Sequence, residues 1–163
     1  MTASDSASEG TEQQGPAIER IFDAPRELVW RSWTEPEHFM RWYGPQGMSL
    51  DVCEIDFRVG GSHLFGMRMP DGQSYFTAGV YREIVPFERF VYTDALADEH
   101  GNPAPVAQGG METVVTVELE DLGDGRTKLT LRQVGWPDES MAAGANVGWN
   151  QALEKLAEVL AGA

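Results

Sequence analysis

The stretch from Met48 to Val134 consists mostly of short segments in which apolar and polar residues alternate, and this pattern limits the fold more than any other feature. Alternation with a period of two is typical of strands that bury one face. Two turns, PDG after Met69 and GDG after Leu122, join neighbouring segments as hairpin turns do. About six strands are therefore expected here, and AIERIF before Pro25 predicts one more at the start. We expect an antiparallel sheet of six or seven strands.

Helical patterns flank this run of strands. Two short helices are predicted directly after the first strand, by PRELVWRSWT and TEPEHFMRWYGP, each with a proline in its first turn. One long amphipathic helix is predicted over residues 138–160, because an apolar stripe recurs there at helical spacing. The order of elements indicates an α+β fold in which the long helix covers the concave face of a curved sheet. The stripe consists of Met141, Ala145, Trp149, Leu153, Leu156 and Leu160.

A single helix laid across a curved sheet need not fill the whole groove, so we expect a pocket between the two. Gly144 and Gly148 each cost the helix about 1 kcal/mol relative to Ala, which indicates that space is kept beside it. In the strand around residue 78, the alternation leaves open whether the parity of Phe76 or that of Tyr81 points inward. Close-packed core is the alternative interpretation of every candidate. The candidates to line the pocket are Trp33, Phe39, Trp42, His63, Phe65, Met67, Met69, Phe76, Tyr81, Tyr92, Val115, Val117, Met141, Ala145, Trp149 and Leu153.

The charge balance limits the partners. With 26 acidic against 12 basic residues the net charge is −14, which repels nucleic acid and anionic lipid headgroups. The apolar runs are too short for membrane insertion. The opening residues MTASDSASEG lack the basic and apolar regions of a signal peptide, so a cytoplasmic protein is expected. Residues 1–15 read as a disordered acidic tail and residues 16–163 as one domain.

Residue types that carry metal or covalent chemistry are scattered. No second ligand lies at a metal-binding spacing from any of the three histidines, His38, His63 and His100, or from the single cysteine, Cys53. We therefore expect no metal and no other cofactor. No nucleophile motif is present, and no catalytic residue is assigned. Acid–base chemistry by a buried carboxylate or His63 stays open, as does the role of the Gly- and Pro-rich loop over residues 95–110.

Two blocks of the sequence resemble a known family. They are AP-x-x-x-VW-x-x-WTEPE-x-x-x-x-W, within residues 24–42, and the series DFRVGG, PDG and GVYREIVPFER that follows it. In these blocks the chain is similar to proteins named after the activator of the heat-shock protein 90 ATPase, in the START-like (SRPBCC) superfamily. The resemblance implies a helix-grip fold and a cavity for a small hydrophobic or aromatic molecule, with no assigned reaction. It leaves open a polyketide cyclase- or dehydratase-like enzyme and a co-chaperone-like domain, and a homodimer or a chaperone as partner.

Overall fold

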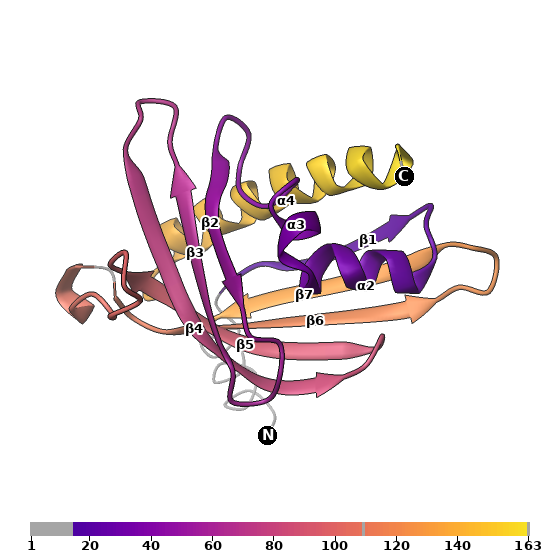
Figure 1. Ribbon diagram of the computed structural model, residues 1–163, viewed down its shortest axis with the longest axis horizontal. Helices are drawn as coiled ribbons and strands as arrows, with labels where there is room; N and C mark the ends of the chain where they lie inside the picture. The colour runs from indigo at the N-terminus through magenta and orange to yellow at the C-terminus, as the bar shows by residue number, and fades with distance from the viewer. Residues whose placement is uncertain (1–14, 109, 163) are drawn as a thin grey trace, which may run out of the picture.

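A computed structural model describes residues 15–108 and 110–162 of the chain. Seven antiparallel strands form one sheet in the order β1-β7-β6-β5-β4-β3-β2. The sheet curves strongly, and one long helix crosses it while two short helices lie near its middle (Figure 1). In chain order the elements are β1 (Ala17–Phe22), α2 (Arg26–Thr34), α3 (Pro36–Phe39), β2 (Ser49–Ile55), β3 (Ser62–Arg68), β4 (Ser74–Val85), β5 (Arg89–Ala97), the 3-10 helix η1 (Val106–Gln108), β6 (Thr113–Asp121), β7 (Thr127–Val134) and α4 (Glu139–Ala161).

The strand pairing follows the hairpins that the sequence predicts. Consecutive strands from β2 to β7 pair with one another, and β1 joins the sheet beside β7, with Ile18 opposite Leu131. A bulge interrupts the pairing of β2 with β3 between Leu50 and Val52. The predicted α+β architecture is therefore confirmed. The tail expected over residues 1–15 lies, apart from Gly15, outside the described residues.

A second irregularity, between Tyr81 and Glu83 in the pairing of β4 with β5, accompanies the inward parity of β4. Tyr81 is buried, and Tyr75 and Thr77 face the same side of the sheet as α4. Phe76 lies on the opposite face, where its ring packs over Gly66 of β3. The alternative that the sequence left open is thereby decided in favour of the Tyr81 parity.

The aromatic side chains of α2, α3 and the turn after α3 are core. Trp33, Phe39 and Trp42 are buried, and the Trp33 and Trp42 ring centroids lie 4.7 Å apart. The Trp42 Nε1–H group donates a hydrogen bond of 2.8 Å to the Ser32 carbonyl, so this indole has no unpaired polar atom. The ring of Trp149 stacks on Trp33 from α4, with centroids 5.7 Å apart. The two short helices therefore fasten the long helix to the sheet.

The long helix begins with a side-chain cap. The Asp138 carboxylate accepts a 2.8 Å hydrogen bond from the Met141 backbone N–H, as expected for an N-cap residue. Its C-terminal half buries Leu153, Leu156 and Leu160 against the sheet. This arrangement, a curved antiparallel sheet closed by a C-terminal helix, is the helix-grip fold that the resemblance implies. None of the described helices has both the length and the apolar composition needed to span a membrane.

Candidate functional site

A pocket of about 320 Å³ lies between the sheet and the N-terminal half of α4. Its wall is mostly apolar, and it draws residues from the turn after α3, from strands β3 to β7 and from the helix. The lining residues are Tyr43, Gly44, Pro45, Met67, Tyr75, Thr77, Asp94, Ala95, Leu96, Met111, Thr113, Gln133, Trp136, Met141, Ala145, Gly148, Trp149 and Ala152.

The pocket exists because side-chain size changes along α4. From its first turns to just past its middle, the helix carries Ala145, Gly148 and Ala152 toward the sheet, at the spacing that places residues on one side. Leucines occupy the equivalent face of the second half and fill the space there. A Cβ at Gly148 would meet the Pro45 ring at 3.4 Å, whereas one at Gly144 would meet nothing within 4 Å. The helix therefore closes tightly at one end and stays open at the other.

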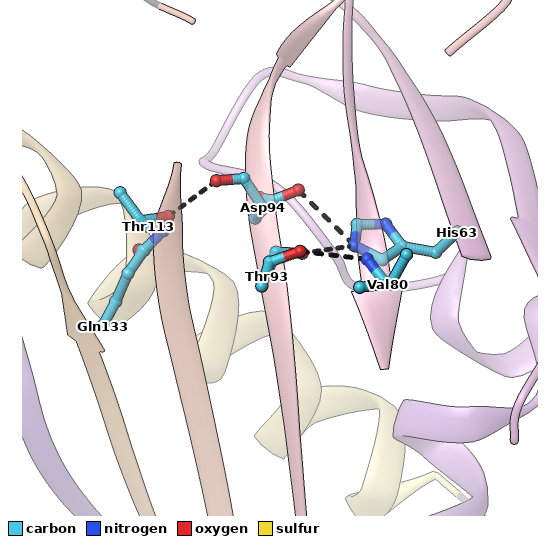
Figure 2. A network of polar contacts seen from close by, with 6 residues as sticks. All are labelled: His63, Val80, Thr93, Asp94, Thr113 and Gln133. Atoms are coloured by element: carbon cyan, nitrogen blue, oxygen red, sulfur yellow. Dashed lines mark hydrogen bonds and ion pairs between the residues drawn. The ribbon is translucent and has the colours of Figure 1, made fainter. Parts of the chain in front are cut away.

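A chain of hydrogen bonds holds the polar side of the pocket. The Trp149 Nε1–H donates to the Gln133 amide oxygen at 2.7 Å, and the Gln133 amide nitrogen donates to the Thr113 hydroxyl at 2.8 Å. The Thr113 hydroxyl donates in turn to the Asp94 backbone carbonyl at 2.9 Å, as Figure 2 shows. The four residues of this chain come from four different elements, α4, β7, β6 and β5. The polar groups of these links are consequently occupied by one another.

Asp94 is the carboxyl group of this pocket. Only 8% of the residue is exposed, and its Oδ1 atom has no hydrogen-bond partner among the described residues. Burial raises the pKa of Asp94 to about 8, and the nearby Thr77 hydroxyl opposes the shift only in part. A carboxyl group with this pKa is mostly protonated at neutral pH. The pocket therefore presents an uncharged acid that can donate a hydrogen bond.

His63 lies beside Asp94 without forming an ion pair with it. Its Nε2 atom is 2.8 Å from the Thr93 carbonyl oxygen and 3.7 Å from the Asp94 Oδ1 atom (Figure 2). Because a carbonyl only accepts, Nε2 carries the proton and Nδ1 is left bare, with no partner in the described structure. Burial lowers the pKa of His63 to about 4, against a weaker opposing effect of the Thr93 carbonyl. The imidazole is thus neutral at physiological pH.

Two tyrosine hydroxyls complete the polar lining. Burial and the nearby Asp94 carboxylate raise the pKa of Tyr43 well above its ordinary value and also raise the pKa of Tyr75. Both phenols stay protonated over the whole physiological range. Within the described ranges, no group of three or more His, Cys, Asp and Glu side chains is placed to hold a metal ion.

The sequence-predicted site residues fall into three groups. Met67, Met141, Ala145 and Trp149 line the pocket. Phe76, on the far face of β4, and Met69, in the turn after β3, are not among the lining residues. The remaining candidates are buried in the core next to the pocket: Trp33, Phe39, Trp42, His63, Phe65, Tyr81, Tyr92, Val115, Val117 and Leu153.

The sequence prediction missed Asp94 and Gln133. A signal for each was present, because Asp94 shares the parity of Phe90 and Tyr92 on its strand, and Gln133 shares that of Leu129 and Leu131. A polar residue that continues an inward apolar row is a candidate for a buried, functional group. Trp136 also lines the pocket, from the segment that joins β7 to α4.

Comparison with known proteins identifies relatives of the whole fold. A sequence model of the family described as Activator of Hsp90 ATPase homolog 1-like protein matches residues 23–161. The crystal structure of a protein from Chromobacterium violaceum is 30% identical, with 90% of this chain and 96% of that chain covered and a TM-score of 0.77. The solution structure of a protein from Arthrobacter aurescens is 29% identical, with 94% and 89% covered and a TM-score of 0.78. No curated protein matches the chain.

Proposed function

The chain belongs to the family of Activator of Hsp90 ATPase homolog 1-like proteins, and we propose that it binds a small hydrophobic or aromatic molecule in the pocket between the sheet and α4. The observation that carries the proposal is the pocket itself. Its volume of about 320 Å³ falls within the range of small-molecule sites, and most of its lining side chains are apolar. Removing apolar ligand surface from water supplies about 25 cal/mol per Å² of driving force.

The flexibility of part of the wall supports a binding role. Met67, Met111 and Met141 contribute thioethers, which are flexible and polarizable and fit ligands of different shape. Met141 is 38% exposed and places an apolar side chain at the edge of the pocket. A ligand that contacts this side chain would cover apolar surface that the protein alone leaves in water.

We assign no reaction to the pocket. His63, the nearest basic side chain to Asp94, is buried and is not among the lining residues. Its one protonated nitrogen is already bound to the Thr93 carbonyl. Asp94 alone provides proton donation but no partner base that contacts the pocket among the described residues. Binding therefore accounts for the geometry without a chemical step.

A pocket-filling substitution tests the proposal. The fluorescence of N-phenyl-1-naphthylamine, which rises in apolar surroundings, is titrated with the protein and with two variants of the same helix. Ala145→Phe places a ring in the pocket, whereas Ala143→Phe adds the same ring at an exposed position that does not line it. We expect saturable one-to-one binding to the wild type and to Ala143→Phe, and affinity at least tenfold weaker for Ala145→Phe. Unchanged affinity of a folded Ala145→Phe protein would place the probe elsewhere.

A further inference from the structure

We propose that the pocket selects uncharged apolar molecules that carry a hydrogen-bond acceptor, such as a ketone or quinone oxygen, and that Asp94 donates a hydrogen bond to this acceptor. The inference deepens the proposed function and rests on it. It follows from which polar atoms of the pocket lack a partner, from what those atoms can donate, and from the absence of a basic side chain in the lining.

Three lining residues have a buried polar atom without a hydrogen-bond partner in the described part of the chain. They are Thr77 at Oγ1, Asp94 at Oδ1 and Trp136 at Nε1. The Thr77 hydroxyl lies near enough to Asp94 to lower the pKa of that carboxyl group, but the two side chains form no hydrogen bond of standard geometry. The side chains of Thr113, Gln133 and Trp149 in the same wall use their polar atoms on one another and on the Asp94 carbonyl. The Tyr43 and Tyr75 hydroxyls add two groups that can donate. A buried polar atom without a partner costs about 1–3 kcal/mol, so a ligand that supplies the partner gains affinity.

The chemistry of these atoms favours an acceptor on the ligand. The Trp136 indole N–H can only donate. A protonated carboxyl group at Asp94 adds one O–H donor, and the hydroxyl of Thr77 can donate as well. A ketone oxygen has two lone pairs and no proton, so it complements donors and cannot serve a second acceptor. A pure hydrocarbon leaves every one of these atoms unsatisfied.

Charge discriminates further among ligands. Neither Lys nor Arg is among the lining residues, so an anionic ligand would be buried without a counter-charge. The nearest basic group of α4, Lys155, donates instead to the Pro45 carbonyl at 3.3 Å, outside the lining. Carboxylates, including fatty-acid anions, should therefore bind more weakly than neutral carbonyl compounds of the same size.

The pH dependence of the acceptor preference should come from Asp94 alone. Every other titratable group that faces Asp94 from the packed elements keeps one charge state between pH 6 and 9, because burial is the main cause of each shift. His63 titrates near 4 and Cys53 near 12, and the pKa of each facing tyrosine is raised. From β6, β7 and α4 the polar residues that line the pocket are Thr113, Gln133 and Trp149, and none of them titrates. The facing tyrosines are Tyr43, Tyr75, Tyr81 and Tyr92.

Displacement of N-phenyl-1-naphthylamine by three matched naphthalenes tests the inference. At pH 6.5 we expect 2-acetylnaphthalene to displace the probe at a concentration about five- to tenfold lower than 2-ethylnaphthalene, the size of one hydrogen bond. The anion 2-naphthoate should be the weakest of the three. At pH 9, where Asp94 is mostly ionised and no longer donates, the ketone should lose most of its advantage.

Variants at Asp94 and Trp136 separate the effect of hydrogen-bond donation to the ligand from the effect of the shape of the pocket. Asp94→Asn keeps an N–H donor that does not titrate, so the ketone preference should persist at both pH values. Asp94→Leu removes the donor and should abolish most of the ketone preference at both pH values. Trp136→Phe removes the indole N–H and should reduce the ketone preference at both pH values. For each variant the affinity for the ketone is divided by the affinity of the same variant for 2-ethylnaphthalene, which cancels changes in the shape of the pocket, and circular dichroism checks that the variant is folded.

Three results would overturn the inference. They are equal affinity for the ketone and the hydrocarbon at pH 6.5, tightest binding of 2-naphthoate, or preference for 2-(2-naphthyl)ethylamine that grows with pH. The last would mean that Asp94 acts as a counter-ion for cations. Failure of the proposed function gives a different result, because then neither N-phenyl-1-naphthylamine nor 2-ethylnaphthalene binds in the pocket.

Discussion

Replacing Asp94 by Asn should make the free energy of unfolding less dependent on pH. In the folded protein burial raises the pKa of Asp94 to about 8, whereas the same carboxyl group in the unfolded chain titrates near its ordinary value of 3.8. Between these two pKa values the folded state holds a proton that the unfolded state has released. The contribution of this group to stability is therefore fully present below pH 3.8 and is lost as pH rises through 8.

The magnitude follows from the two pKa values. Between the unfolded and the folded pKa, each unit of rising pH lowers the free energy of unfolding of the wild type by up to about 1.4 kcal/mol. Above the folded pKa this free energy no longer changes with pH through Asp94. The free energy of unfolding of Asp94→Asn, measured relative to the wild type, should therefore rise by about 1.3 kcal/mol from pH 6 to 7 and by about 1 kcal/mol from pH 7 to 8. From pH 8 to 9 it should rise by less than about 0.5 kcal/mol.

Urea denaturation followed by circular dichroism at pH 6, 7, 8 and 9 measures this difference. His63 stays neutral over this range because burial holds its pKa at about 4, so it does not distort the comparison. Asp98→Asn is the control: Asp98 is exposed, and its hydrogen bonds from the Asn102 backbone and side chain lower its pKa, so its difference from the wild type should be constant. A constant difference for Asp94→Asn as well would show that Asp94 is ionised in the folded protein, and the reasoning would fail.

Four further substitutions test the account. Burial lowers the pKa of His63 to about 4 in the folded protein, against an ordinary value of 6.5 in the unfolded chain, so the wild type loses stability as pH falls from 6.5 to 4. Denaturation curves at pH 7 and pH 5 should show a smaller loss of stability for His63→Gln than for the wild type. A Cβ at Gly79 would lie 1.9 Å from the Thr93 carbonyl oxygen, so Gly79→Ala should cost at least about 2 kcal/mol, and a neutral result would contradict this packing. Gly144→Ala meets nothing within 4 Å and should raise the free energy of unfolding by up to about 1 kcal/mol; destabilisation would mean that this face of α4 is in contact. Trp42→Phe removes the hydrogen bond to Ser32 and leaves that carbonyl unpaired, so thermal unfolding should reveal a loss of about 1–3 kcal/mol.

Much of the fold could be predicted because its determinants are local. The alternation between Met48 and Val134 and the turns PDG and GDG specify hairpins, and the stripe from Met141 to Leu160 specifies a helix. These patterns depend on neighbours in sequence, so they can be recognised without a structure. The order of strands then follows, apart from the pairing of β1 with β7, which joins residues more than a hundred positions apart.

The site was harder to predict because it depends on contacts between distant segments. Asp94 is buried only because β4, β6 and α4 close around it, and its pKa follows from that burial. The inward parity of β4 follows from its pairing with β5, where Tyr81 lies opposite Tyr92, and both faces of the strand carry apolar residues in the sequence. Whether Leu153 or Ala145 lines a pocket depends on how far the helix stands from the sheet at each turn. Periodicity identifies the buried face of α4 but not the half of it that leaves space.

Carbon-13 labelling of the methionine methyl groups provides the most direct test of a ligand between the sheet and α4. Met67, Met111 and Met141 line the pocket, whereas Met40 and Met69 do not, so the two sets report binding and its absence in one spectrum. When 2-acetylnaphthalene is added, ring-current shifts should appear at the three pocket methyl groups and saturate together, while the signals of Met40 and Met69 stay in place. Shifts confined to Met40 or Met69, with the pocket methyl groups unmoved at saturation, would contradict the account.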